Sequence, residues 1–209
     1  MAHLSAANRL DWFQMSRVET APEADTADAP PFRLDNEQLA LRFTATLSDR
    51  YGTPVERLPT PGRLDDWLHA NGLRAAPPAA SPADLEQARA LRESIHRIGT
   101  AIATGDNPEP QDVETLNLVA RHEHGHLELR GTTAHWTTAS DQPTVAALAS
   151  IAQDAITALT GQRGTLKTCQ NPACGGLFLD TSRAQARRWC SMNICGNRAK
   201  KARYRGTGS

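Results

Sequence analysis

The chain has little of what a membrane or secreted protein needs. No apolar run approaches the 18 or so residues of a membrane-spanning helix, and the first residues lack the basic-then-apolar pattern of a secretory signal. Cysteine is scarce, with four residues in 209. These absences predict a cytoplasmic protein without membrane contact. In that setting thiols stay reduced, which favours metal ligation over disulfides for the cysteines.

Acidic side chains are nearly missing from the C-terminal part. Residues 163–209 contain ten basic residues and one acid, Asp180, whereas residues 1–162 contain 13 basic and 22 acidic residues. The formal net charge of +0 therefore combines −9 with +9. This separation predicts an acidic body and a basic segment that contacts a polyanion such as nucleic acid.

The sequence also contains no complete catalytic motif. One motif of a metal-dependent protease is present, but the further ligand that it requires is missing. His122-Glu-His-Gly-His126 matches the H-E-x-x-H pattern of zinc proteases, which needs both histidines on one helix face and a third ligand downstream. Gly125 and the alternation at Leu127-Glu-Leu129 instead indicate a turn that enters a strand, and no glutamate follows Glu128. We therefore predict that the protein is not an enzyme and has no catalytic residues. An exposed loop is the favoured interpretation of the histidines, with metal binding or pH sensing as the alternative.

Residues 1–31 are predicted to be a weakly ordered extension, because they are rich in proline, alanine and acid with little to bury. From there to residue 162, the patterns predict a mainly helical domain with a small antiparallel sheet. Apolar and polar residues alternate from Leu39 to Leu47, which predicts a strand. Helices are predicted from Pro61 up to Asn71, from Pro82 up to Gly105, from Asp112 to Ala120 and from Pro143 up to Gly161, and a β-hairpin over 127–137.

The four cysteines form two C-x4-C pairs, Cys169 with Cys174 and Cys190 with Cys195. Two such knuckles that close on one point supply the four thiolates of a tetrahedral zinc site. We therefore predict one structural Zn²⁺ ion held by all four. Because four thiolates leave no coordination position for water, this zinc is not expected to be catalytic.

A basic segment follows the second knuckle at once. A helix that starts near Cys195 would place Arg198, Lys201 and Arg205 on one face. Such cations bind DNA phosphates, and one or two arginines can read guanine edges. The DNA-contact candidates are Arg187, Arg188, Arg198, Lys200, Lys201, Arg203 and Arg205. A solvated basic tail that tethers weakly to any polyanion is the alternative, and RNA also remains open.

Three segments carry a resemblance to a known family. Phe178-Leu-Asp-Thr-Ser182, Arg188-Trp-Cys-Ser-Met192 and Cys195-Gly-Asn-Arg-Ala-Lys200 resemble the CGNR-type zinc finger, over roughly residues 164–205. In that bacterial family the finger follows an ABATE domain, described as a stress-induced transcription regulator. The resemblance implies an ABATE-like regulatory, ligand-binding domain at 32–162 and a basic, DNA-binding CGNR-type finger at 163–209.

Together these observations predict an α+β protein: a mainly helical N-terminal domain with a small antiparallel sheet, and a small C-terminal zinc-finger module with four cysteine ligands. The expected function is zinc-dependent transcription regulation through double-stranded DNA, with an N-terminal domain that senses a small-molecule ligand or a partner. Because one short finger reads few base pairs, a homodimer is also expected. The alternative is a protein- or RNA-interaction module in which zinc is a structural staple and the basic surface a docking site.

Overall fold

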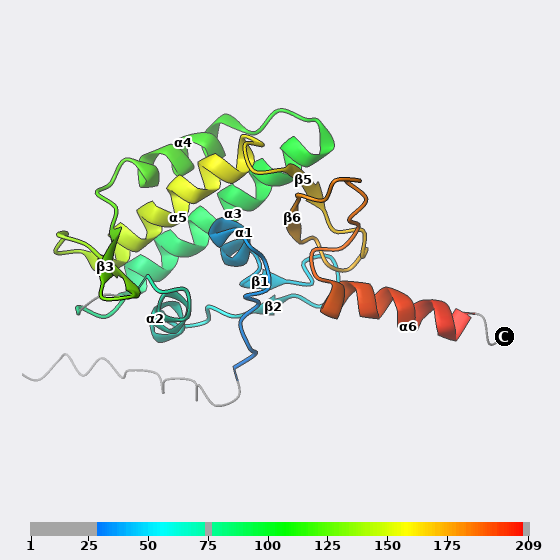
Figure 1. The fold of residues 1–209 in the computed structure, drawn as a ribbon, viewed down its shortest axis with the longest axis horizontal. Coiled ribbons are helices and arrows are strands. Elements are labelled where there is room, and N and C mark those ends of the chain that lie inside the picture. Colours follow the sequence, from blue (N-terminus) through cyan, green and yellow to red (C-terminus); the bar gives the residue numbers. More distant parts are fainter. Residues whose placement is uncertain (1–28, 74–76, 207–209) are drawn as a thin grey trace, which may run out of the picture.

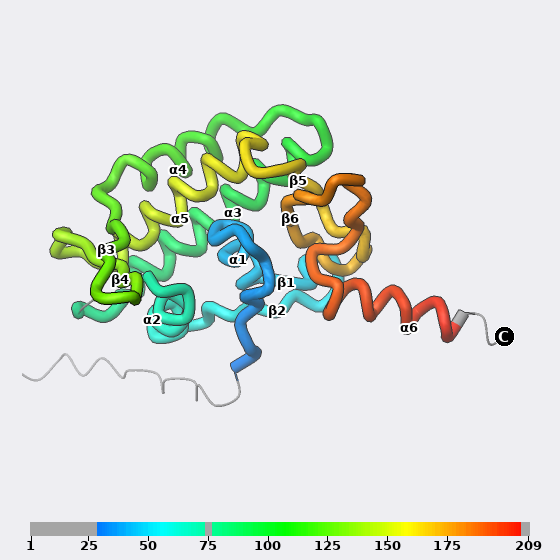
Figure 2. The backbone as a smooth tube through the Cα atoms, in the orientation of Figure 1, coloured from blue at the N-terminus to red at the C-terminus, as the bar shows by residue number. Residues whose placement is uncertain are grey.

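A computed structural model of the chain describes residues 29–73 and 77–206. Most of the predicted N-terminal extension therefore lies outside the described residues. The chain path runs from a helical body to a small C-terminal module, and a last helix points away from both (Figure 2). The described part contains no helix that is long and apolar enough to cross a membrane.

Three long helices lie side by side and form most of the body (Figure 1). They are α3 (Pro82–Thr104), α4 (Pro110–Ala120) and α5 (Pro143–Leu159). Two shorter helices, α1 (Leu39–Thr44) and α2 (Pro61–Ala70), pack against them. The predictions of α2, α3 and α5 are thus confirmed. Helix α4 begins two residues before the predicted start, because Pro110 suits the first helical turn.

Three two-stranded antiparallel sheets complete the fold of the described residues. The first joins β1 (Leu47–Ser48) to β2 (Val55–Glu56), and the second is the predicted hairpin of β3 (His126–Arg130) and β4 (Thr133–Thr137). The third pairs β5 (Thr165–Thr168) with β6 (Leu177–Asp180) in the C-terminal module. A π-helical turn, η2 (Met192–Gly196), then leads into α6 (Asn197–Gly206). The α+β fold class is confirmed.

The ends of α3 show how sequence signals fix a helix. The Ser81 hydroxyl accepts from the Asp84 amide at 3.1 Å, and the Asp84 carboxylate accepts from the Ser81 amide at 2.7 Å. This reciprocal capping box satisfies donors that have no partner within the helix. At the other end Gly105 has φ 83°, a left-handed conformation that glycine adopts without strain.

The predicted strand from Leu39 to Leu47 is wrong, because residues 39–44 form α1. Burial of Ala40, Leu41, Phe43 and Thr44 follows helical spacing, and this face packs on α5. The first turn is also capped from a distance, since the Ala40 amide donates to Asp154 of α5 at 2.8 Å. Period-two alternation in a short segment does not exclude a helix, and here the tertiary contacts decided.

One hydrophobic core joins the body to the C-terminal module. Leu166, Leu177 and Leu179 of the β5–β6 sheet are buried in the same cluster as residues of α3 and α5. The approach is close at Gly99 in the middle of α3, where an added Cβ would lie 2.5 Å from the Leu177 side chain. A mid-helix glycine is unfavourable in itself. At this position it leaves room for the Leu177 side chain of β6.

Candidate metal centre and basic helix

The four cysteine sulfurs converge on one point. All four Sγ atoms lie within 4.8 Å of one another, with Cys174–Cys190 at 3.6 Å and Cys190–Cys195 at 3.7 Å. Zinc bound to four sulfurs at about 2.3 Å places neighbouring sulfurs roughly 3.8 Å apart, whereas a disulfide needs about 2.05 Å. The spacing therefore fits one structural zinc ion and not a pair of disulfides.

Local hydrogen bonds shape the first knuckle around this site. The Cys169 amide donates to the Gly176 carbonyl at 2.8 Å, and the Cys174 amide donates to the Asn171 carbonyl at 2.9 Å. An added Cβ at Gly176 would lie 3.1 Å from the Cys174 sulfur and 3.2 Å from the Cys190 sulfur. Glycine at this position thus keeps the space beside two ligands clear.

The second knuckle is held by Ser191 and packed by Trp189. The Ser191 hydroxyl accepts from the Ile194 amide at 3.2 Å, and its carbonyl accepts from the Cys195 and Gly196 amides at 3.0 Å each. Trp189 packs against the cysteine cluster.

Asp180, the one acid of residues 163–209, accepts hydrogen bonds from other residues of the finger. Its carboxylate accepts from Lys167 Nζ at 2.7 Å, from the Ser182 hydroxyl at 2.6 Å and from the Arg187 amide at 3.0 Å. These donors, Lys167 foremost, hold the pKa of Asp180 well below its ordinary value. The carboxylate is fully buried, so it leaves the outer surface of the finger basic.

The finger is docked on a loop of the body. The Arg50 amide donates to the Cys174 carbonyl and the Tyr51 amide to the Ala173 carbonyl, both at 3.2 Å. His96 of α3 lies 2.7 Å from the Gly175 carbonyl through Nε2, which must donate because a carbonyl only accepts. Burial, together with the nearby Arg50 charge, lowers the pKa of His96 and so favours its neutral form. The first knuckle is thereby fixed to α3 and to the loop after β1.

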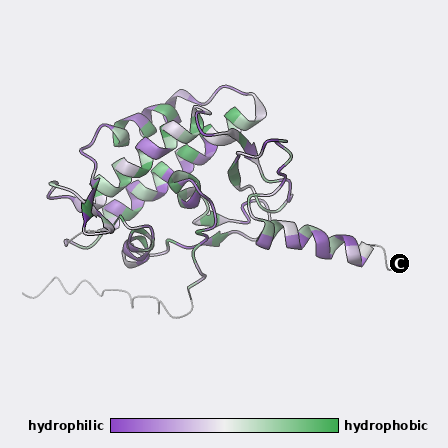
Figure 3. Cartoon of the chain, in the orientation of Figure 1, coloured by the Kyte–Doolittle hydropathy of each residue, from purple (hydrophilic) through white to green (hydrophobic). Residues whose placement is uncertain are grey.

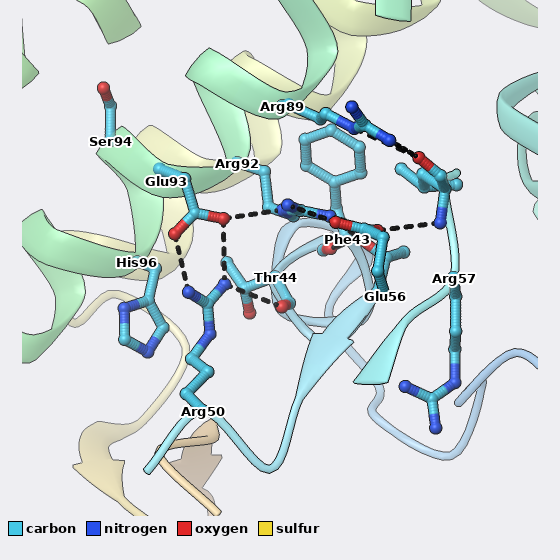
Figure 4. A network of polar contacts seen from close by, with 12 residues as sticks. Phe43, Thr44, Arg50, Glu56, Arg57, Arg89, Arg92, Glu93, Ser94 and His96 are labelled. Carbon is cyan, nitrogen blue, oxygen red and sulfur yellow. Dashed lines mark hydrogen bonds and ion pairs between the residues drawn. The ribbon is translucent and has the colours of Figure 1, made fainter. Parts of the chain in front are cut away.

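Behind this loop lies a network of charged side chains (Figure 4). Arg50 makes two hydrogen bonds to Glu93, at 2.6 and 3.3 Å. Arg92 is nearly buried and bridges Glu93 at 2.8 Å and both oxygens of Glu56, each at 2.8 Å. The network therefore ties α3, β2 and the knuckle-binding loop together.

Acid should weaken this network. Burial raises the pKa values of Glu56 and Glu93, but hydrogen bonds and charge from Arg92 and Arg50 outweigh it and leave both below normal. A lowered folded-state pKa contributes stability above the unfolded value of about 4.3, and this stability is lost as pH falls through the folded values. We expect the free energy of unfolding, measured by urea titration, to fall as the pH is lowered from about 6 to about 3. Glu56→Gln should flatten that dependence, and an equally steep curve for the variant would contradict the assignment.

Helix α6 leaves the second knuckle and projects beyond the body (Figure 1). Figure 3 shows it as strongly hydrophilic, and it carries five cations and no acid. Arg198 in its first turn pairs with Asp49 of the body at 2.6 Å. Farther along the helix the basic side chains are exposed, namely Lys200, Lys201, Arg203 and Arg205.

The two candidates before the second knuckle have partners within the finger. The Arg187 guanidinium donates to the Trp189 carbonyl at 2.9 Å and to the Cys190 carbonyl at 2.6 Å, and it stacks on Phe178 at 4.8 Å. Arg188 is exposed, bonds Gln170 and lies over the Trp189 ring. The sequence does not show these partners, because they are brought together only by the finger's fold.

The histidine motif does not form a helical metal site. Helix α4 ends at Ala120, and His122, His124 and His126 lie exposed in the loop and at the start of β3. Within residues 29–73 and 77–206, the four cysteines are the one group of three or more His, Cys, Asp or Glu side chains that could hold a metal ion. The loop interpretation of this segment is thus confirmed.

The site contains residues that no sequence motif predicts. Asp49, Arg50 and His96 touch the finger from the body, and no local motif marks them. Gly99 was the one available signal, since a glycine inside an otherwise regular helix often marks a close approach.

Comparison with protein families matches both parts of the chain. Residues 37–162 match the ABATE family, described as "Putative stress-induced transcription regulator", and residues 165–206 match the CGNR zinc finger. No curated protein is similar enough in sequence to extend this comparison. The first match covers more than half of the chain, and the second covers all four zinc ligands. The chain therefore belongs to the ABATE family of regulator-type proteins and ends in a CGNR zinc finger with one structural zinc site.

Proposed function

We propose that this protein binds double-stranded DNA through α6 and acts as a zinc-dependent transcription regulator. The observation that carries the proposal is the projecting helix (Figure 1), which has no acid and presents four exposed cations beyond its first turn, where the fifth cation, Arg198, pairs with Asp49. An α-helix with its side chains is about 10–12 Å across, and the major groove of B-DNA is about 12 Å wide. Its dimensions and charge thus suit insertion into that groove.

The proposed contacts differ in role. Lys200, Lys201, Arg203 and Arg205 are the proposed DNA-facing residues of α6, with Arg188 as a phosphate contact on the finger surface. Arg187 has its donors directed to carbonyl groups of the finger, so we assign it a supporting role. With about four to six phosphates neutralised, log affinity should fall with log salt at a slope of about −4 to −5.

The ABATE domain would sense a ligand or a partner and transmit its state to the finger. The shared core and the loop at Arg50 and Tyr51 provide a direct physical connection. Because one helix reads few base pairs, we further propose that two copies bind together. Light scattering that shows a monomer with and without DNA would contradict this last point.

The decisive experiment compares two duplexes at near-physiological salt. Zinc-loaded protein is titrated with DNA from its own promoter and with a scrambled duplex of equal length. A preference of about a hundredfold for the promoter supports the regulator, since specific DNA readers commonly reach larger ratios. Equal and steeply salt-dependent binding would instead indicate a polyanion tether and favour the interaction-module alternative, with a protein or RNA partner.

Neutralising the exposed face of α6 should weaken DNA binding strongly. Lys200→Gln with Lys201→Gln removes two phosphate contacts, so the salt slope should become shallower by about 1.8 and affinity at about 0.15 M salt should fall about thirtyfold. Fluorescence anisotropy over a salt series measures both. Arg121→Gln with Arg130→Gln removes the same charge from the residue after α4 and from β3, and it serves as the matched control because β3 lies at the opposite end of the molecule from α6 (Figure 1). An equal loss in both variants would show that only net charge matters.

A further inference from the structure

Arg198, in the first turn of α6, is paired with the body. Its Nη1 lies 2.6 Å from Asp49 Oδ1, and its Nη2 lies 3.3 Å from Oδ2. This is a two-pronged pair of a guanidinium with a carboxylate, a geometry that fixes direction as well as distance. The contact joins the first turn of α6 to a residue 149 positions earlier in the chain.

The Asp49 carboxylate is itself firmly placed. Asp49 is buried, its φ is 53°, and the same carboxylate also receives Arg33 at 3.4 Å. The residues that follow it are those that bind the first knuckle through the amides of Arg50 and Tyr51. Asp49 is therefore fixed relative to both the metal centre and the body, and it can act as a reference point for α6.

Charge alone would argue against an acid at this position. A carboxylate beside a DNA-binding helix repels phosphate and neutralises one of its five cations. We propose, on the basis of the DNA-binding function proposed above, that Arg198 is a positioning residue and not a DNA contact. Asp49 holds it so that α6 leaves the finger in one fixed direction, and this direction determines which duplexes the helix can read.

The test is Asp49→Asn, with Asp35→Asn as the matched control. Asparagine tolerates the left-handed backbone of Asp49, so the loop should keep its shape while the ion pair is lost. Asp35 is exposed and lines the cleft between body and finger, so its replacement removes the same charge nearby. We expect Asp49→Asn to weaken binding to the promoter duplex about tenfold and to leave binding to the scrambled duplex within about twofold. The control should bind both duplexes equally well or slightly more tightly.

The difference between promoter binding and scrambled-duplex binding distinguishes a positioning role from simple loss of structure. Partial unfolding would weaken both duplexes together, whereas a loosened helix keeps its charge and loses mainly its selectivity. If Asp49→Asn binds the promoter more tightly, as charge removal alone predicts, the proposal is overturned and Asp49 is a mask over a DNA contact. A double-mutant cycle with Arg198→Gln adds a second criterion: the two losses should not add, because both remove the same pair.

A readout without DNA keeps the test valid if the chain binds no duplex at all. Hydrogen exchange at the amides of residues 49–52 and 197–201 should quicken in Asp49→Asn and stay unchanged in Asp35→Asn. If the protein binds no duplex but exchange is faster in Asp49→Asn, the proposed function is refuted. The positioning of α6 by the Asp49–Arg198 pair is then still supported. Unchanged exchange in Asp49→Asn would refute the proposal that the Asp49–Arg198 pair positions α6.

Discussion

Removal of zinc is expected to unfold the finger and also to destabilise the body. Structural zinc contributes about 10–16 kcal/mol to the folding of small finger peptides, and the few apolar residues around the cysteines cannot replace it. Here Leu166, Leu177 and Leu179 of the finger belong to the core of the body. When the finger opens, these side chains leave that core. We expect the melting temperature of the body helices to fall by on the order of 10 °C.

Circular dichroism in the helical band, with and without a strong chelator, measures this effect. Cys174→Ser should reproduce it without a chelator, and added zinc but not magnesium should restore the chelated wild type. Hydrogen exchange would then locate the damage, because amides of α3 near Gly99 should lose protection together with those of the finger. An unchanged body melt after complete zinc removal would mean that the finger is an independent module.

Replacing Arg92 by methionine is expected to lower the free energy of unfolding by about 3–5 kcal/mol. The Arg92 side chain is 4% exposed and bridges Glu56 and Glu93. Loss of one partner from a buried ion pair leaves the remaining charges without compensation, which is far more costly than the net value of the pair. Glu93 still has its ion pair with Arg50. Most of the lost free energy should therefore come from Glu56, whose ion pair with Arg92 is removed.

Arg130→Met provides the comparison, because Arg130 also pairs with a glutamate at 2.9 Å. That pair lies on the surface hairpin, where the side chains of Arg130 and Glu128 are 61% and 43% exposed. Exposed pairs contribute about 0–1 kcal/mol. Urea unfolding should therefore show a large loss in the free energy of unfolding for Arg92→Met and a small loss for Arg130→Met. Similar small losses would mean that water reaches the Arg92 network and screens it.

Some elements of the fold follow from local sequence signals alone. The capping box at Ser81 and Asp84, the glycine at 105 and the apolar spacing between them determine α3 with little help from the rest of the chain. The strand predicted from Leu39 to Leu47 is wrong, because alternation in a short segment does not exclude a helix. There the cap from Asp154 and the packing against α5 stabilise a helix. Neither contact is visible until the two segments meet.

The sequence by itself determined the zinc ligands, the basic character of the last helix and the family of the chain. Each depends on residue type and short spacing: two C-x4-C pairs, a run of cations, and the Cys195-Gly-Asn-Arg198 motif. Tertiary structure decided that the finger shares the core of the body and that Arg198 meets Asp49. Those contacts join residues that lie far apart in the chain. Short-range periodicity carries no information about them, and only the packing of α3 against β5 and β6 brings them together.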